Sequence, residues 1–329
     1  MKKIILIISV VMLAAGILGC AVTALPTMLK GEKYMNDIID GKSKKQEFSF
    51  DDTFTGLDVN ILSADTTVSY NSGNEVRVSY ITADKNKKAE CNITDGVLNI
   101  KEKSGFSLFS LFTLGSVPTK IEISLPESYR DSSTLENADI TVTSGSLSGD
   151  LPYTKKSTKL KLYSGKISSS VATENFDINV SSGTAEISSR NNEHKNVNVS
   201  VLSGKITLDG FISEKSDYSL TSGKIVSANI GGGELFTNVA SGSLTLGCSE
   251  KVTYIDAKVA SGKADISVPK GTGAQVAYST ASGSVKIGLD GENNRLIGSG
   301  NISYGNAETK VNVNVASGSF ILDTDAISE

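Results

Sequence analysis

The sequence predicts an all-β protein, a β-solenoid with coils of about 20 residues that follow an N-terminal membrane helix. Three observations predict this fold. A Ser-Gly pair flanked by two apolar, strand-like segments recurs nine times between residues 144 and 318, at Gly-to-Gly intervals of 20, 18, 21, 19, 19, 20, 21 and 35 residues. Apolar and polar residues alternate on both sides of the pairs. Trp is absent and aromatic residues make up only 6% of the chain, which is typical of short strands joined by turns.

The spacing around each Ser-Gly pair predicts a change of direction there. The last apolar residue before the pair and the first one after it are five apart, as in Val201 and Ile206. Because side chains alternate between the two faces of a strand, an unbroken strand would place these residues on opposite faces. We therefore expect a corner at each pair, with the glycine at positive φ. The corner glycines are Gly145, Gly165, Gly183, Gly204, Gly223, Gly242, Gly262, Gly283 and Gly318.

Two architectures would place both apolar sets on one core. In a hairpin meander or β-sandwich, Ser-Gly is a two-residue turn, and Val201 faces Ile206 across the ladder. In a β-solenoid, each repeat is one coil, and equivalent strands stack in parallel. The favoured hairpin turns Asn-Gly and Asp-Gly occur at none of the nine sites, and a uniform Ser can stack along one edge. The pattern favours the solenoid.

Residues 1–30 are predicted to be a membrane segment. Lys2 and Lys3 precede an uncharged apolar run of 26 residues, which is long enough to span a bilayer once as a helix. The paired lysines favour a cytoplasmic N-terminus. A rival interpretation is a lipoprotein, because ILGC at 17–20 resembles a lipobox with Cys20 as the lipidated residue. The run stays apolar after Cys20, which favours the uncleaved anchor. Both interpretations place the body outside the cytoplasm.

The rest of the chain divides into three parts. Residues 31–47, GEKYMNDIIDGKSKKQE, are predicted to be a charged stalk. Residues 48–143 contain alternating strands with less regular turns, and they are expected to cap the solenoid. Residues 144–329 contain the Ser-Gly repeats and are expected to form the solenoid itself.

One stretch, SGFSLFSLFTLGSVP at 104–118, is too apolar for an ordinary surface loop. We expect it to cover the open end of the core, or to form a hairpin packed against its neighbours. The alternative is an exposed contact for a partner or a membrane, carried by Phe106, Phe109 and Phe112.

Residues that could support catalysis or metal binding are sparse. The single His, His194, lies in the polar sequence SRNNEHKNV and is expected to be a solvated loop residue. The chain contains no C-x-x-C, H-E-x-x-H or G-x-S-x-G motif, and no cofactor is predicted. Cys91 is expected to face inward. It could pair with Cys248 outside the cytoplasm, but two independent thiols are favoured.

A glycan-cleaving β-helix needs clustered carboxylates on one strand face. We expect instead that the acidic residues are scattered and do not recur at one phase of the repeat: Asp177, Glu186, Asp209, Asp256, Asp265 and Asp290. Such scatter also argues against a regular ion-binding ladder. The outward positions predict a flat polar face that is suited to glycan or protein contact, as at Thr245, Lys258, Ser267 and Asn314. The net charge of −4 is mild and argues against a nucleic-acid partner.

Three stretches resemble a known bacterial family: FTGLDVNILSADTTVSY at 54–70, IEISLPES at 121–128 and VNVSVLSGKITL at 197–208. Together with the membrane segment, they resemble the putative-adhesin family of unknown function, which includes LiaG-like membrane-anchored proteins encoded with cell-envelope stress systems. The resemblance extends from about residue 46 to residue 323. It implies a β-solenoid-like domain that faces the cell wall, and it offers no catalytic residues to carry over.

The sequence therefore predicts a non-catalytic, membrane-anchored protein of the cell envelope. Its predicted partner is a cell-wall glycan or another wall polymer, or a membrane protein. A second hypothesis is an accessory protein of a membrane sensor that docks through the apolar residues 105–114. A glycan-active β-helix enzyme is the third.

Overall fold

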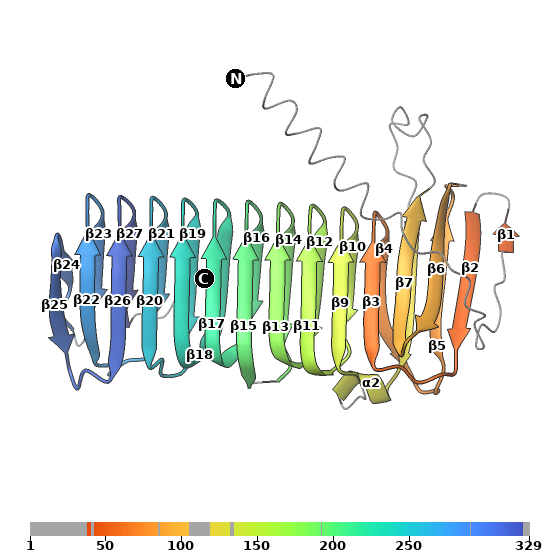
Figure 1. Ribbon diagram of the computed structural model, residues 1–329, viewed down its shortest axis with the longest axis horizontal. Helices are drawn as coiled ribbons and strands as arrows, with labels where there is room; N and C mark the ends of the chain where they lie inside the picture. Colours follow the sequence, from red (N-terminus) through yellow and green to blue (C-terminus); the bar gives the residue numbers. More distant parts are fainter. Residues whose placement is uncertain are drawn as a thin grey trace, which may run out of the picture. The chain divides into compact units, whose positions relative to one another are not determined.

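Each repeat of the chain contributes one strand to each of two β-sheets, here called sheet A and sheet B, around one apolar core (Figure 1). The computed structural model describes residues 38–40, 43–84, 86–104, 119–131, 135–191, 193–289 and 291–324. The Ser-Gly pairs lie in the turns that lead from sheet B to sheet A, and equivalent strands of successive coils pair in parallel. The solenoid prediction is confirmed, and the hairpin alternative is wrong.

Sheet B contains the strands that precede the corners, together with further strands at its two ends. In spatial order they are β6 (Lys87–Thr94), β7 (Val97–Ser104), β3 (Gly56–Ile61), β9 (Asn137–Val142), β11 (Thr154–Leu162), β13 (Thr173–Val180), β15 (His194–Val201), β17 (Ile212–Leu220), the second part of β18 (Lys224–Val239), β20 (Tyr254–Val259), β26 (Thr309–Val315), β22 (Ala274–Thr280) and β25 (Ser299–Tyr304).

Sheet A contains the strands that follow the corners, together with further strands at its two ends. In spatial order they are β1 (Ile38–Asp40), β2 (Ser43–Phe50), β5 (Val76–Thr82), β8 (Thr119–Pro126), β4 (Asp65–Asn71), β10 (Ser146–Asp150), β12 (Lys166–Val171), β14 (Thr184–Ser189), β16 (Lys205–Asp209), the first part of β18, β19 (Ser243–Cys248), β21 (Lys263–Ser267), β27 (Ser319–Asp323), β23 (Ser284–Gly288) and β24 (Asn294–Leu296). A short helix, α2 (Ser128–Asp131), follows β8.

The coils do not stack strictly in chain order. The β26/β27 coil lies between the β20/β21 and β22/β23 coils, although it comes last in the sequence. The long interval between Gly283 and Gly318 holds β24 and β25, which pair antiparallel with β23 and β22. At the other end, the β3/β4 coil lies between the later coils β7/β8 and β9/β10. Both ends of the stack are therefore made by a segment that passes outward and returns.

Several predicted segments lie outside the described residues: the segment 1–30 with Cys20, and the stretch 105–118 with its three Phe residues. Within the part of the chain that the structure describes, no helix is both long enough and apolar enough to cross a membrane. The expected stalk does not extend to residue 47, because β2 begins at Ser43 and pairs antiparallel with β5. Its buried Gln46 accepts a hydrogen bond from the backbone N–H of Ala89 at 2.9 Å.

The corner glycines do not have the positive φ that we expected. Their role is close approach. At all nine corners an added Cβ would come within 2.5 Å of the carbonyl oxygen in the corner of the neighbouring coil. At Gly204 the same Cβ would also meet the Val180 side chain. Only a residue without a Cβ lets successive corners stack at strand spacing.

The first coil of the ladder supports this explanation. Its corner is Ser63-Ala64, and Ala64 is fully buried. In the adjacent β7/β8 coil, Ser104-Gly105 stands at the equivalent position in the sequence, but residues 105–118 lie outside the described part of the chain. The next corner shows the difference, because a Cβ on Gly145 would collide with the carbonyl oxygen of Ala64. Among the described residues, glycine thus stands at the nine corners that stack on another corner, and alanine stands at the first corner.

A buried carboxylate closes this end of the ladder. In the stacked corners, backbone N–H groups donate to carbonyls of the neighbouring corner, as from Ser144 to Leu62 at 2.9 Å. At the first corner, the N–H groups of Leu62, Ser63 and Ala64 donate instead to Glu102 Oε2, at 2.8, 2.7 and 3.0 Å. The Glu102 side chain has no exposed surface, and Lys87 Nζ lies 3.9 Å from its other oxygen. Glu102 thus replaces the missing carbonyls.

The close approach predicts a specific cost for Gly204→Ala. We expect it to lower the free energy of unfolding by roughly 3 kcal/mol, because the new Cβ meets backbone that cannot move away. Gly271→Ala is the control: Gly271 has φ +80° and open space around its missing Cβ, so it should lose only about 1–2 kcal/mol through backbone strain. Urea unfolding of the full chain in detergent measures both. A larger loss for Gly271→Ala would contradict the close-approach explanation.

Removal of the Glu102 carboxylate should also destabilise the fold. Glu102→Ala leaves three backbone N–H donors without their acceptor, and we expect a loss of roughly 3 kcal/mol or more. Glu102→Gln keeps an acceptor oxygen and should lose less. Glu90→Gln, which breaks only exposed ion pairs, should change the unfolding free energy by less than about 1 kcal/mol. Similar losses in Glu102→Ala and Glu90→Gln would argue against the capping role.

Candidate functional site

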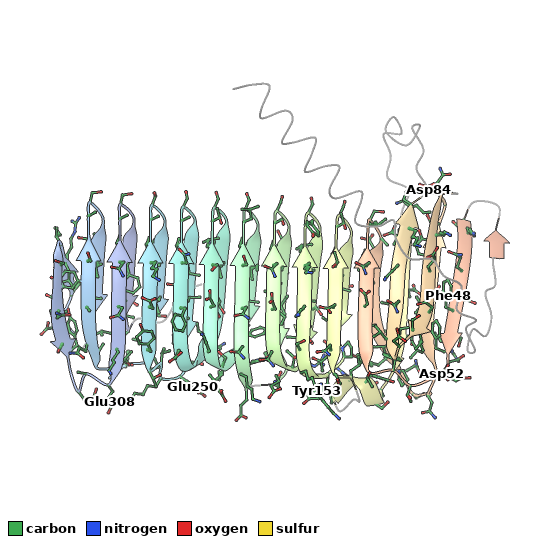
Figure 2. All side chains as sticks on the ribbon, viewed as in Figure 1. Phe48, Asp52, Asp84, Tyr153, Glu250 and Glu308 are labelled. Carbon is green, nitrogen blue, oxygen red and sulfur yellow. The ribbon has the colours of Figure 1, made fainter. Side chains whose placement is uncertain are left out.

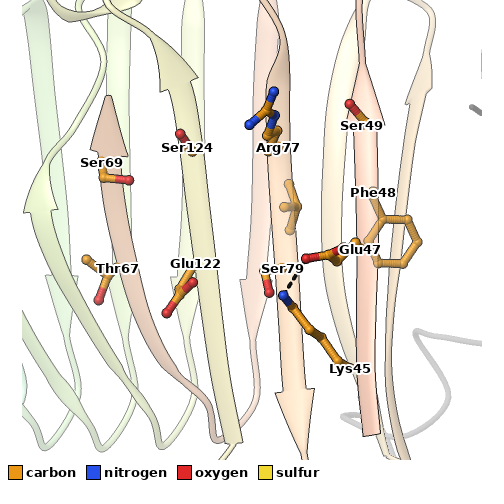
Figure 3. A pocket seen from close by; sticks show the side chains of 11 residues that line it. Lys45, Glu47, Phe48, Ser49, Thr67, Ser69, Arg77, Ser79, Glu122 and Ser124 are labelled. Carbon is orange, nitrogen blue, oxygen red and sulfur yellow. Dashed lines mark ion pairs between the residues drawn. The ribbon is translucent and has the colours of Figure 1, made fainter. Parts of the chain in front are cut away.

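The outer face of sheet A is hollowed where β2, β5, β8 and β4 lie side by side (Figure 3). This polar cleft has a volume of about 670 Å³. Most of the residues that line it are two apart on their strands and so lie on one face of the sheet, and Phe48 and Val78 from the alternate positions also line it. The polar residues that line it are Lys45, Glu47, Ser49, Thr67, Ser69, Arg77, Ser79, Glu122 and Ser124.

The charges of the polar cleft follow from strand register. Glu47 lies opposite Ser79, and Ser79 lies opposite Glu122, so a Glu-Ser-Glu row crosses three strands. Lys45 Nζ contacts Glu47 at 2.5 Å (Figure 3). Arg77 contributes a second cation and pairs with Glu75 at 2.8 Å. The cleft therefore offers charged groups of both signs beside five hydroxyls.

Two hydroxyls in the polar cleft have unused hydrogen-bonding capacity. The Oγ atoms of Ser49 and Ser79 are buried and have no partner in the described structure. Their neighbour Ser124, by contrast, accepts a hydrogen bond from Asn71 Nδ2 at 2.9 Å. An unpaired buried hydroxyl costs free energy, and a ligand's polar group recovers it if the Ser side chain rotates toward the cleft. These two hydroxyls make the cleft the stronger candidate among the outer faces.

Sheet B carries a second polar surface, and here the expected scatter of acidic residues is wrong. One row, at the position five residues before each corner Ser, contains Asp58, Asp139, Lys159, Asp177, Asn198, Asp217, Phe236, Asp256 and Asn312. On sheet A, Glu186 and Asp265 likewise share a row with Glu122. Asp290 lies outside the described residues.

In the sheet B row, the carboxylates find hydrogen-bond partners within the protein. From Asp139 onward the carboxylates occupy alternate strands, which limits repulsion between like charges. The same carboxylates accept hydrogen bonds along their own strands, for example Asp177 from Asn179 at 2.7 Å. No group of three or more His, Cys, Asp or Glu side chains within the described ranges could hold a metal ion. The row therefore does not form a metal centre.

The structure corrects two further expectations. His194 begins β15 and is 3% exposed, stacked on Phe211 with ring centroids 5.1 Å apart, instead of lying in a solvated loop. Its Nε2 lies 2.8 Å from Ser189 Oγ. Burial lowers the pKa of His194 below that of an exposed imidazole. Ser267, expected to face outward, is buried.

Both described cysteines are free thiols. Cys91 is buried in β6, as expected, and it forms no bridge with Cys248 at the end of β19. Burial raises the pKa of both thiols, that of Cys248 to about 12. Neither has the low pKa that a nucleophilic cysteine requires.

Comparison with known proteins agrees with this fold. The model of the family described as Toastrack DUF4097 matches residues 54–322. A putative adhesin from Parabacteroides merdae is 13% identical with a TM-score of 0.51, covering 87% of this chain and 99% of its own. A putative lipid binding protein from Parabacteroides distasonis is 16% identical with a TM-score of 0.50, covering 86% of this chain and 97% of its own. No curated protein matches the chain. At these identities the solved structures show the fold alone.

The buried imidazole predicts a pH dependence of stability. Because the folded pKa of His194 is depressed, the unfolded chain takes up the proton first, and stability should fall as pH drops below the unfolded value of about 6.5. The slope contributed by this one group is at most about 1.4 kcal/mol per pH unit. His194 is the only His in the chain, so urea unfolding of His194→Gln at pH 7.5 and 5.5 isolates its contribution. An unchanged pH slope in the variant would contradict it.

Proposed function

Because the chain belongs to the Toastrack DUF4097 family, we propose that it is a non-catalytic, adhesin-like protein of the bacterial cell envelope. Its ligand is a polyhydroxylated wall polymer, bound in the polar cleft of sheet A. The observation that carries this proposal is the pair of buried hydroxyls, Ser49 and Ser79, which lack partners beside charged groups of both signs. Sugar hydroxyls donate and accept hydrogen bonds, so they can satisfy Ser, Arg and Glu side chains at once.

The shape of the polar cleft supports a polymer over a small isolated ligand. It runs over four neighbouring strands on an outer face of the sheet. Neighbouring strands lie about 4.8 Å apart, so the lining groups repeat on a scale of a few ångströms across the sheet. Such a surface can contact consecutive units of a chain that lies across the strands.

Binding is favoured over hydrolysis at this site. Glu47 and Glu122 lie on one face, two strands apart with Ser79 between them. A glycosidase uses two carboxyl groups in its reaction, and here the ion pair with Lys45 already occupies Glu47. The arrangement therefore supports a holding role.

The proposed location is the outer side of the cell membrane. Residues 1–30 would attach the protein as a single-pass anchor, or Cys20 would carry a lipid in the alternative. The apolar run and the two preceding lysines support this proposal. Docking on a membrane sensor through residues 105–114, and a link to envelope stress, rest on the sequence and the family resemblance.

The cleft proposal predicts weaker wall binding in Arg77→Gln/Glu122→Gln. Loss of two charged hydrogen-bonding groups should weaken sedimentation of the full chain with isolated bacterial cell wall by about tenfold or more. The matched control is Lys286→Gln/Glu234→Gln, which removes one cation and one anion from exposed positions outside the cleft.

Two results would contradict the proposal. Equal wall binding by the cleft variant and the control would exclude the polar cleft as the binding site. Release of reducing ends from the wall by the unaltered protein, lost in Glu122→Gln, would replace binding with hydrolysis.

A further inference from the structure

The edge formed by the corners carries a row of uncharged residues. We call this row the apex row. It consists of the residue before the Ser in each of ten stacked corners: Leu62, Thr143, Tyr163, Ser181, Leu202, Thr221, Ala240, Ala260, Ala316 and Ala281. Among the described residues, four large hydrophobic side chains are exposed, and three of them lie in this row. They are Leu62 at 36%, Tyr163 at 51% and Leu202 at 57% exposure.

The exposed apolar side chains are held at fixed intervals. Leu62, Tyr163 and Leu202 occupy the first, third and fifth corners, so neighbours are separated by two strand spacings, about 9–10 Å. Their backbone is tied to the neighbouring coil, as by the bonds from Tyr163 N–H to the Val142 carbonyl and from Leu202 N–H to the Val180 carbonyl, both 2.9 Å. These side chains therefore project along one line from a rigid edge.

Lysines flank the apex row. Within three residues of the ten apex positions there is one acidic residue, Asp65, and there are six lysines: Lys161, Lys166, Lys205, Lys224, Lys258 and Lys263. All six side chains are exposed. Half of them have an acidic neighbour within ion-pair distance, and the other three, Lys161, Lys205 and Lys224, have no ion pair among the described residues. This edge is cationic in a chain of net charge −4.

The opposite edge has a different character. Its turns vary in length and carry acidic side chains such as Glu250 and Glu308 (Figure 2). Glu308 is paired with Lys251. Exposed apolar tips bordered by cations are thus a feature of the corner edge.

We propose that the apex row rests on the surface of an anionic phospholipid bilayer. Leu62, Tyr163 and Leu202 reach the boundary between headgroups and acyl chains, where Tyr and aliphatic side chains partition. Lys205 and Lys224, which have no ion pair among the described residues, and Lys166, whose ion pair with Glu186 is exposed, lie against the lipid phosphates, and each gains from the negative surface potential. This contact is separate from the polar cleft, and it uses the proposed attachment through residues 1–30 only to bring the edge near lipid.

The charge pattern favours a bilayer over other occupants. Two copies joined edge to edge would bring lysines of like charge together, which is unfavourable. The core of a protein interface is continuous and depleted of charge, whereas these tips alternate with Thr and Ser and are bordered by lysines. A fluid bilayer accommodates separated tips and a charged rim together.

The chain contains no Trp, so a single substitution creates a local reporter. Full chain carrying Tyr163→Trp is reconstituted in nanodiscs of phosphatidylglycerol and phosphatidylcholine, and separately mixed with preformed vesicles of the same composition. Lipids brominated in their acyl chains serve as quenchers. We expect a blue shift and quenching of the Tyr163→Trp emission. Tyr153→Trp, at the opposite edge, is the matched control and should show neither (Figure 2).

The contribution of the lysines is tested by combining Lys166→Gln, Lys205→Gln and Lys224→Gln with Tyr163→Trp, or by measuring Tyr163→Trp at high salt. Either change should reduce the quenching in anionic lipid, because it weakens the attraction to the lipid phosphates. No quenching of Tyr163→Trp in loaded nanodiscs, or equal quenching in purely zwitterionic lipid, would overturn the proposal. A blue shift that needs no lipid and grows with protein concentration would assign the edge to a second copy instead. Quenching by vesicles without insertion into nanodiscs would support the lipid contact and contradict the attachment through residues 1–30.

Discussion

A missing Cβ at one position of each coil is the constraint on which the structure depends. Successive corners approach so closely that the carbonyl oxygen of one corner occupies the space of the next residue's Cβ. Glycine accepts this approach, and the backbone bonds between corners then continue from coil to coil. Each such bond contributes only about 0.5–1.5 kcal/mol net, but the ladder extends along the whole edge. Where it begins, the Glu102 carboxylate supplies the acceptors that no neighbouring corner provides.

Fixed register converts each position of the repeat into a row on the surface. The position before the corner Ser gives the apex row, and the position five residues before it gives the carboxylate row on sheet B. A single coil has little binding surface, but when coils stack, the residues at one position of the repeat form a continuous line of side chains. The polar cleft has another origin, because it lies where β2, β5 and β8 pair antiparallel and the regular stacking ends. Regular coils thus make extended surfaces, and the irregular end makes the hollow.

The sequence specified the architecture better than its details. Period-two alternation and the five-residue spacing at Ser-Gly predicted a change of direction in each repeat, and the uniform Ser with the absence of Asn-Gly and Asp-Gly turns favoured the solenoid over a hairpin meander. The prediction of positive φ at the corner glycines was wrong, because a repeated glycine can reflect either a positive φ or a lack of space for a Cβ. The alanine at the equivalent corner, Ala64, was the one sign in the sequence that φ is not positive there.

The carboxylate row was missed because the coils differ in length, so the acidic residues do not recur at a constant interval. Counting back five residues from each corner Ser brings Asp139, Asp177 and Asp217 into line. His194 is separated from the next inward residue, Val197, by two exposed residues, which hides it from a search for alternation. The polar cleft depends on pairings between distant segments, which no local pattern encodes.

The insertion of the β26/β27 coil between two earlier coils has a consequence for biosynthesis. Coils up to β21 can add to the stack one after another as the chain emerges from the ribosome or the translocon. The β22/β23 coil cannot dock in its final place at once, because its neighbour on that side, the β26/β27 coil, is synthesised after it. Until residue 323 has emerged, the far end of the stack stays unfinished, and its exposed strand edge is open to incorrect pairing. Closure of this end of the stack therefore waits for the synthesis of β27.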